Sequence, residues 1–186
     1  MALPSSPEFR FRGDRNYLSG TTVFDWFLSQ DPQATNIDCV FHKMTGFQCA
    51  VKSGTPKNGP KLVAVYQSDG LTAHLEETTL PIVDRYDCNE AQICDRLRLR
   101  GDIAAFEFPL IDTATLIEVL IGAYKLLLTT NVSSIPGKLV VARCRLKNIF
   151  QFGTGQVVHH RRNGNFFEAQ IRHEDQPIGN LYFGVK

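Results

Sequence analysis

The chain has 186 residues, 43% of them hydrophobic, and its 20 lysines and arginines nearly balance its 19 acidic residues, leaving a net charge of +1. A chain of this length buries roughly 70% of its unfolded surface, so we expect one domain or two small fused ones that need no disulfide or metal to fold. A protein with so little net charge has no strong positive field to attract the phosphates of a nucleic acid. This argues against a nucleic-acid partner.

Neither a membrane span nor an export signal is expected. The longest apolar runs, at 116–121 and 126–128, fall well short of the ~20 residues that a span requires. The first residues lack the basic start and apolar stretch of a signal peptide, which favours the cytoplasm. The five cysteines are therefore expected to be reduced, and their spacing indicates no metal site.

The first half of the chain predicts a short helix followed by strands. The chain opens with a segment at 9–15 that begins with apolar residues. Over 21–29, apolar residues recur with helical spacing, which predicts the helix. Asp69-Gly70, between two apolar runs, predicts a hairpin turn, and the Gly- and Pro-rich segment 56–60 predicts a surface loop. Strands are expected at 37–43, 47–52, 61–67 and 71–77.

The second half predicts the same order with a longer helix. After an opening strand at 102–109, a helix over 113–130, with Asp112 or Thr113 as its N-cap, is apolar on almost every side, which indicates burial. Asn163-Gly164 predicts a hairpin turn, and alternation in the strand after it predicts one buried and one solvated face. Strands are expected at 138–147, 155–161, 165–173 and 180–185.

These elements predict an internal duplication. We expect a first half at 1–80, a charged linker with a connecting helix at 81–101, and a second half at 102–186. A long hydrophobic helix is covered when a sheet curls around it and a second unit completes the sheet, which is an α+β architecture.

Short motifs carry a resemblance to a known family. Arg145-Leu146-Lys147 and Phe152-Gly153-Thr154 resemble the Arg-Phe-Lys and Pro-Gly-Asp elements of the β-hydroxyacyl-ACP dehydratases. Phe108-Pro109 resembles their His-Phe-Pro segment, and Leu116-Ile117-Glu118 resembles the helix that bears their catalytic acid. The resemblance implies a double hotdog, in which two curved antiparallel sheets each wrap a central helix and join into one continuous sheet.

The resemblance also implies a function. We expect a protein that processes acyl thioesters of fatty acid or polyketide metabolism, as a dehydratase, hydratase or thioesterase, with an acyl chain in a groove between the halves. The substrate would be carried on the phosphopantetheine of an acyl carrier protein or of CoA, with no further cofactor and no metal. A homodimer is compatible with this expectation, and neither nucleic acid nor membrane is an expected partner.

One departure from the family opens an alternative. The family's catalytic histidine is missing from both halves, where Phe11 or Arg12, and Glu107, stand near its position. The protein can therefore also be a non-catalytic accessory that binds an acyl carrier or a synthase, or an acyl transferase on the same fold. Fold similarity alone does not assign the chemistry.

The candidate catalytic residues are two helix carboxylates and one histidine. Glu118 is a single carboxylate in an apolar helix, where burial would raise its pKa toward the range useful for acid–base catalysis, unless it reaches solvent or bonds a nearby backbone. Asp25, five residues after Gly20, is its expected counterpart, or else an acid early in a helix that complements the dipole. His159 and His160 should point to opposite faces of a strand, so His159 is a candidate substitute for the missing histidine.

The remaining candidates are substrate-binding residues. Arginines suit phosphate, so Arg12 and Arg145 are candidates for the phosphate of CoA or phosphopantetheine, with ordinary surface charge as the alternative. The full predicted binding set is Arg12, Tyr17, Phe24, Phe108, Ile121, Arg145 and Phe152.

Overall fold

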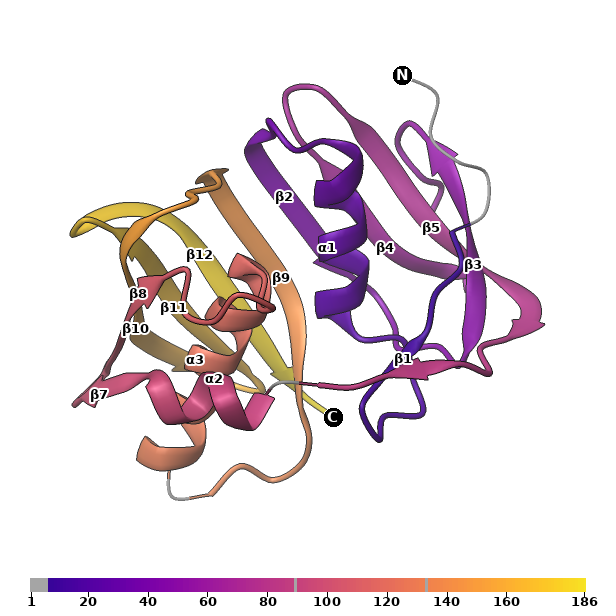
Figure 1. Cartoon of the computed structure of the whole chain (residues 1–186). Coiled ribbons are helices and arrows are strands. Elements are labelled where there is room, and N and C mark those ends of the chain that lie inside the picture. Colours follow the sequence, from indigo (N-terminus) through magenta and orange to yellow (C-terminus); the bar gives the residue numbers. More distant parts are fainter. Residues whose placement is uncertain (1–6, 89, 133) are drawn as a thin grey trace. The chain divides into compact units, whose positions relative to one another are not determined.

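The computed structural model describes residues 7–88, 90–132 and 134–186. Contacts within the chain divide it into two compact units, Met1–Cys88 and Asn89–Lys186, coloured from indigo to magenta and from magenta to yellow in Figure 1. The division falls inside the segment predicted as a linker, of which 81–88 belongs to unit 1 and 90–101 to unit 2.

Unit 1 packs one helix against an antiparallel sheet. Helix α1 (Gly20–Gln30) begins after the N-cap Ser19, whose side chain accepts a hydrogen bond from the Thr22 amide. The sheet has the order β3-β5-β4-β2. Phe24 and Phe27 of α1 are fully buried, and the Phe27 ring stacks on Tyr66 with centroids 4.8 Å apart. The strands are β2 (Thr35–Phe41), β3 (Phe47–Ser53), β4 (Leu62–Gln67) and β5 (Thr72–Pro81).

The opening segment of unit 1 does not join this sheet. Strand β1 (Phe11–Arg12) pairs in parallel with β6 (Arg85–Tyr86) as a separate two-stranded ribbon. The opening segment predicted at 9–15 thus contains a short strand that lies outside the four-stranded order of unit 1. Residues between β5 and the unit boundary supply the partner strand, a pairing that local sequence does not indicate.

Unit 2 wraps a larger sheet along α3 (Leu116–Asn131), with the order β9-β12-β11-β10-β8-β7. The short helix α2 (Glu90–Arg96) packs on α3, where a side chain at Gly122 would lie 3.1 Å from Ile93. Helix α2 is the connecting helix predicted from the sequence, and its buried residue Ile93 packs it on α3. The strands are β7 (Arg98–Arg100), β8 (Ile103–Phe108), β9 (Leu139–Asn148), β10 (Gly153–Asn163), β11 (Phe166–His173) and β12 (Gln176–Val185).

Helix α3 is the buried helix that its composition predicts, but it starts later. Its N-cap is Thr115, not Asp112 or Thr113. The Thr115 hydroxyl accepts a hydrogen bond from the Glu118 amide, and the Glu118 carboxylate accepts one from the Thr115 amide, both at 3.1 Å. This capping box satisfies two amide groups at the helix start, which explains why the helix begins at Leu116.

The two units share an order of elements along the chain but not an order of strand pairing. In unit 2 the strands β10, β11 and β12 are joined by two-residue links, at 164–165 and 174–175, which make successive strands neighbours. In unit 1 the strand after β3 is β4, yet β3 pairs with β5. The segment 54–61 is long enough to cross the ~10 Å of two strand spacings, so the predicted surface loop is a crossover.

Both units nevertheless show the same layers. Each curls an antiparallel sheet along one central helix, as Figure 1 shows for α1 and for α3. The chain is an α+β double hotdog, and both predicted hairpins, at Asp69-Gly70 and Asn163-Gly164, are confirmed by the strand pairs that they join. No helix among the described residues is long and apolar enough to cross a membrane.

Candidate functional site

The sheet of unit 2 has one face toward α3 and one face away from it. On β11 the side chains of Phe167, Ala169 and Ile171 are fully buried and face α3, whereas Glu168 points the other way. This confirms the alternation predicted for the strand. We call the two sides the helix-facing side and the outer face.

His159 lies on the helix-facing side of β10. Its Nδ1 is 3.1 Å from the hydroxyl of Tyr124, a fully buried residue of α3. Burial raises the pKa of Tyr124 above its ordinary value, so this hydroxyl keeps its proton at neutral pH. His160 is exposed, and a bulge in the pairing with β11 lies between His159 and Arg161. His159 is therefore the member of the predicted pair that reaches the central helix.

Glu118 occupies the first turn of α3 and is half-buried. Its carboxylate bonds the Thr115 amide, which is the alternative that the sequence left open for this residue. A capping carboxylate also interacts favourably with the positive end of the helix dipole. The visible role of Glu118 is thus to start the helix.

Glu118 and His159 contact different parts of α3. Glu118 belongs to the capping box in the first turn, whereas His159 meets Tyr124, six residues further along and about 9 Å along the helix axis. The two predicted catalytic residues thus have different partners on the same helix.

A second histidine, His173, lies on the helix-facing side at the Phe108 end. Its ring stacks on Phe150 with centroids 4.2 Å apart, and Phe108 meets Phe150 edge-on at 5.8 Å. Gly155 lies between Phe106 and His173 in the cross-strand row, and a side chain there would come within 2.3 Å of the Phe106 ring. The glycine thus makes room for this aromatic cluster.

His173 is not among the candidates predicted from the sequence, although the pattern of its strand contains a signal for it. The alternation that places Phe167, Ala169 and Ile171 toward the helix extends by one step to His173. Its Nε2 lies 2.9 Å from the carbonyl of Phe152, whose side chain is 74% exposed. Phe108 and Phe152, both predicted to bind substrate, are therefore near one end of unit 2, the end at which α3 and Glu118 begin.

The remaining binding candidates of unit 2 do not share one surface. Ile121 is half-buried on α3. Arg145 is exposed on β9 between the buried Cys144 and Leu146, which face α3, so Arg145 points to the outer face. A ligand on the helix-facing side would not meet Arg145.

The candidates of unit 1 are mostly part of its framework. Phe24 is fully buried beside Tyr66, and Arg12 is 4% exposed, so neither lies on an open surface. Tyr17 is half-buried before α1. Asp25 is half-buried in the second turn of α1, and the first turn holds no acidic residue. A role at the positive end of the helix dipole is therefore excluded for Asp25, and its position in α1 differs from that of Glu118 in α3.

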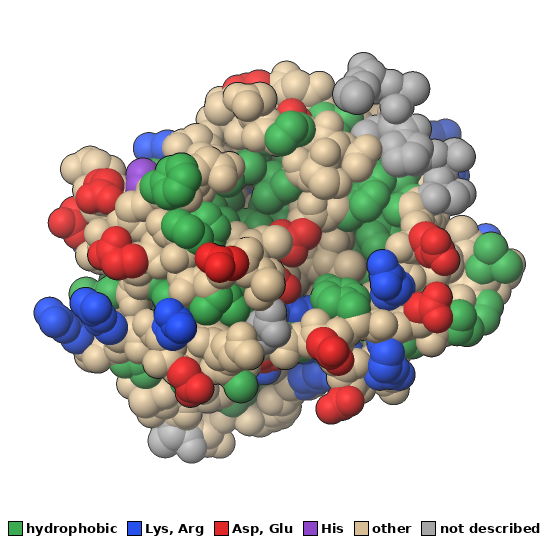
Figure 2. Space-filling view, in the orientation of Figure 1, with side chains coloured by type: hydrophobic (Ala, Val, Ile, Leu, Met, Phe, Trp, Pro, Cys, Tyr) green, Lys and Arg blue, Asp and Glu red, His purple; other side chains and the backbone are tan. Residues whose placement is uncertain are grey.

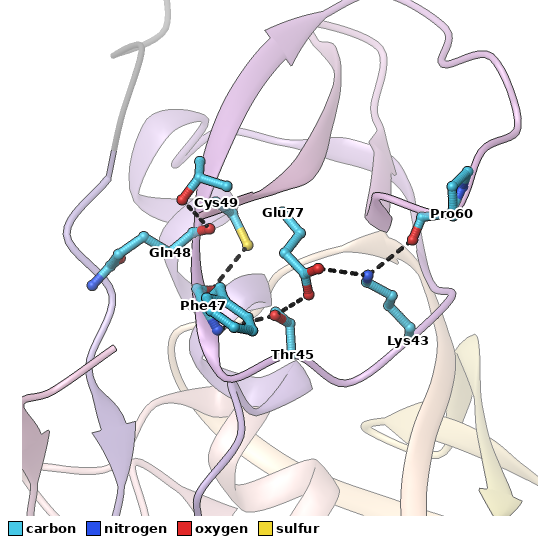
Figure 3. Close-up of polar contacts among 8 residues, drawn as sticks. Lys43, Thr45, Phe47, Gln48, Cys49, Pro60 and Glu77 are labelled. Atoms are coloured by element: carbon cyan, nitrogen blue, oxygen red, sulfur yellow. Dashed lines mark hydrogen bonds and ion pairs between the residues drawn. The ribbon is translucent and has the colours of Figure 1, made fainter. Parts of the chain in front are cut away.

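Unit 1 contains a polar cluster that the sequence did not indicate, drawn in Figure 3. Glu77 accepts a hydrogen bond from the buried Thr45 hydroxyl and pairs with Lys43 at 3.0 Å, while Lys43 also donates to the Pro60 carbonyl at 2.8 Å. The hydrogen bonds from Thr45 and Lys43 hold the pKa of Glu77 below its usual range. Burial and then Glu77 raise the pKa of the Cys49 thiol to about 12, so Cys49 is not a thiolate nucleophile at neutral pH.

The cysteines and the metal-binding residue types are further candidate centres of chemistry among the described residues. On the side seen in Figure 2, acidic and basic side chains are interspersed with apolar ones. None of the five cysteines, all of which the structure describes, forms a disulfide. Within the described parts of the chain, no group of three or more His, Cys, Asp and Glu residues gathers to hold a metal ion.

Several solved structures resemble this chain in shape. A protein described as a thioesterase II from Thermobifida fusca has 10% identity and a TM-score of 0.46, with 99% of each chain covered. The dehydratase domain of RzxB from Pseudomonas fluorescens has 11% identity and a TM-score of 0.47, covering 94% of this chain and 92% of that one. A trans-acyltransferase polyketide synthase enoyl-isomerase has 9% identity and a TM-score of 0.49, covering 98% and 99%.

Comparison of sequences adds no relative. No family model and no curated protein matches the chain. Structural likeness at such identities and TM-scores assigns no function.

Proposed function

We propose that this protein processes acyl thioesters, as a dehydratase, hydratase or thioesterase, and that His159 is its acid–base residue. The observation that supports this proposal is the contact between His159 Nδ1 and the Tyr124 hydroxyl, on a helix-facing side that is otherwise lined largely by apolar side chains. A positioned imidazole suits proton transfer at the carbon or water next to a thioester.

The geometry supports a defined division of roles. Because Tyr124 is fully buried and keeps its proton, it is a positioning residue that holds the imidazole by Nδ1. Proton transfer to a substrate then falls to Nε2. The acyl group would arrive on the phosphopantetheine of CoA or of an acyl carrier protein, in fatty acid or polyketide metabolism in the cytoplasm.

One observation favours a second candidate function, a non-catalytic accessory that binds acyl carriers or a synthase. Glu118, the residue that matches the family's catalytic acid, is engaged in the capping box of α3. A carboxylate that bonds the helix start is already engaged there, whereas His159 bonds Tyr124 in the middle of the same helix. If Glu118 does not act as a catalytic acid, the protein would bind a thioester without converting it.

A panel of acyl-CoA and acyl-carrier thioesters, incubated with the protein and followed by mass spectrometry, separates the two functions. Under the proposal, turnover occurs and falls at least about a hundredfold in His159→Gln. It stays close to wild type in His160→Gln, the exposed neighbour. Turnover that survives in His159→Gln but disappears in Glu118→Gln would move the chemistry to the start of α3.

The same panel tests the second function. A thioester that raises the melting temperature but is not converted supports the accessory role. If no thioester is converted and none raises the melting temperature, both functions are wrong.

A further inference from the structure

Three places in the chain have a sequence that favours succinimide formation, which is an asparagine or aspartate directly before a glycine. They are Asn58-Gly59, Asp69-Gly70 and Asn163-Gly164. In this reaction the backbone nitrogen of the glycine attacks the side-chain carbonyl carbon of the residue before it. Glycine permits the close approach because it has no side chain. The three sequences are alike, but their structural settings are different.

The turn at Asp69-Gly70 holds both reacting groups in hydrogen bonds. The Asp69 carboxylate accepts one from Thr35 at 2.7 Å and one from Asn36 at 2.8 Å. The Gly70 amide donates to the Ser68 hydroxyl at 3.2 Å. Ring closure at this turn would first have to break these bonds.

The turn at Asn163-Gly164 is restrained by its hairpin. Asn163 is the last residue of β10 and pairs with Phe166 of β11, so its backbone belongs to the strand ladder. The Gly164 carbonyl accepts a hydrogen bond from Arg162 Nε at 3.1 Å, and the Arg162 guanidinium lies over the ring of the buried Phe167. Rotation of the Asn163 backbone, which the attack requires, would therefore disturb the ends of two strands.

Asn58-Gly59 lies in the crossover between β3 and β4, outside any helix or strand, and both residues are exposed. Among the described residues, neither the Asn58 side chain nor the Gly59 amide takes part in a hydrogen bond. The bonds that fix this loop involve other groups. The Leu62 amide donates to the Gly59 carbonyl at 3.2 Å, and Lys43 Nζ donates to the Pro60 carbonyl at 2.8 Å, as Figure 3 shows. Ring closure at Asn58 thus costs no hydrogen bond of either reacting group.

We propose that Asn58 is a site of spontaneous deamidation. The Gly59 nitrogen forms a bond to Asn58 Cγ and the bond from Cγ to Nδ2 breaks. The proton of the Gly59 amide passes through solvent and leaves with the side-chain nitrogen as ammonia, and a succinimide ring remains. Water then opens the ring at one of its two carbonyl carbons, which yields aspartate or isoaspartate. The new carboxylate removes the chain's formal net charge of +1. This proposal depends on neither His159 nor acyl chemistry.

The test incubates the full-length folded protein at mildly alkaline pH and follows both asparagines by peptide mapping with mass spectrometry. Isoaspartate is identified by methyl transfer from an isoaspartyl methyltransferase. We expect Asn58 to be converted at least about tenfold faster than Asn163, because an exposed loop opens more readily than the end of a paired hairpin. The variant Asn58→Gln should lose the fast modification and leave the rate at Asn163 unchanged.

The matched control is the same chain in concentrated guanidinium chloride, where folded structure no longer separates the two sites. There the rates at Asn58 and Asn163 should agree within about threefold, because both residues precede glycine. A preference for Asn58 in the folded protein that is no larger than the preference in guanidinium chloride would overturn the proposal. An Asn58 that stays intact in the folded protein, over the time in which the unfolded chain is converted, would overturn it as well.

Discussion

Phe150 and His173 stack nearly face to face, with ring centroids 4.2 Å apart and planes only 9° from parallel. Phe150 follows β9, and His173 ends β11. The stack closes the helix-facing side of unit 2 beside Phe108 and links a loop to the sheet. The exposed Phe152, two residues away, offers a matched control for measuring how much the buried Phe150 contributes to stability.

Replacing Phe150 by alanine should lower the free energy of unfolding by about 3 kcal/mol, since the side chain is 4% exposed and contacts several rings. Phe152→Ala, at a side chain that is 74% exposed, should cost less than about 0.5 kcal/mol. Urea denaturation of both variants gives the comparison. Equal costs would contradict the placement of Phe150 inside the cluster.

Replacing Glu118 separates a capping role from a catalytic one. Glutamine also closes a capping box, so Glu118→Gln should stay within about 0.5 kcal/mol of wild type, whereas Glu118→Ala should lose about 1 kcal/mol of stability. Denaturation midpoints test this, with thioester turnover measured in parallel. Loss of turnover in a fully stable Glu118→Gln would show that the carboxylate does more than start α3.

The bond between Tyr124 and His159 predicts energetic coupling. In a double-mutant cycle of Tyr124→Phe with His159→Ala, the two stability changes should deviate from additivity by about 1 kcal/mol, the net value of one such hydrogen bond. The cycle with His160→Ala serves as the control and should be additive within about 0.5 kcal/mol. Additivity in both cycles would remove the positioning role given to Tyr124.

The Glu77 cluster predicts a loss of stability in acid. The pKa of Glu77 is lowered in the folded state by hydrogen bonds from Thr45 and Lys43, so the unfolded chain binds more protons as the pH falls. The stabilisation is present above pH ~4.5 and is lost as the pH falls through the folded-state pKa. Thr45→Val, which removes the hydroxyl donor, should flatten the decline between pH 5 and pH 3 in thermal melts. An unchanged slope would contradict the hydrogen bond.

The periodicity of the sequence determined most elements of this protein. Apolar residues at helical spacing located α1 and the buried α3, and apolar runs and two-residue alternation located most strands of both sheets to within a few residues. Strand β7 was missed, because it lies in the segment predicted as a charged linker. Two short turns, at Asp69-Gly70 and Asn163-Gly164, also set their own strand pairs. These features depend on side chains close together in the chain, so composition and spacing are enough to find them.

Tertiary structure alone decided which distant segments meet. The pairing of β3 with β5, the ribbon of β1 and β6, and the stack of Phe150 on His173 each join segments far apart in sequence. Helix α3 starts after Thr115 and not after the predicted N-caps Asp112 or Thr113, because the capping box supplies acceptors for its first amide groups. Likewise, alternation placed His159 and His160 on opposite faces of one strand, but only the contact with Tyr124 showed that His159 is the one that faces α3. Such contacts join residues far apart in the chain, which local spacing does not record.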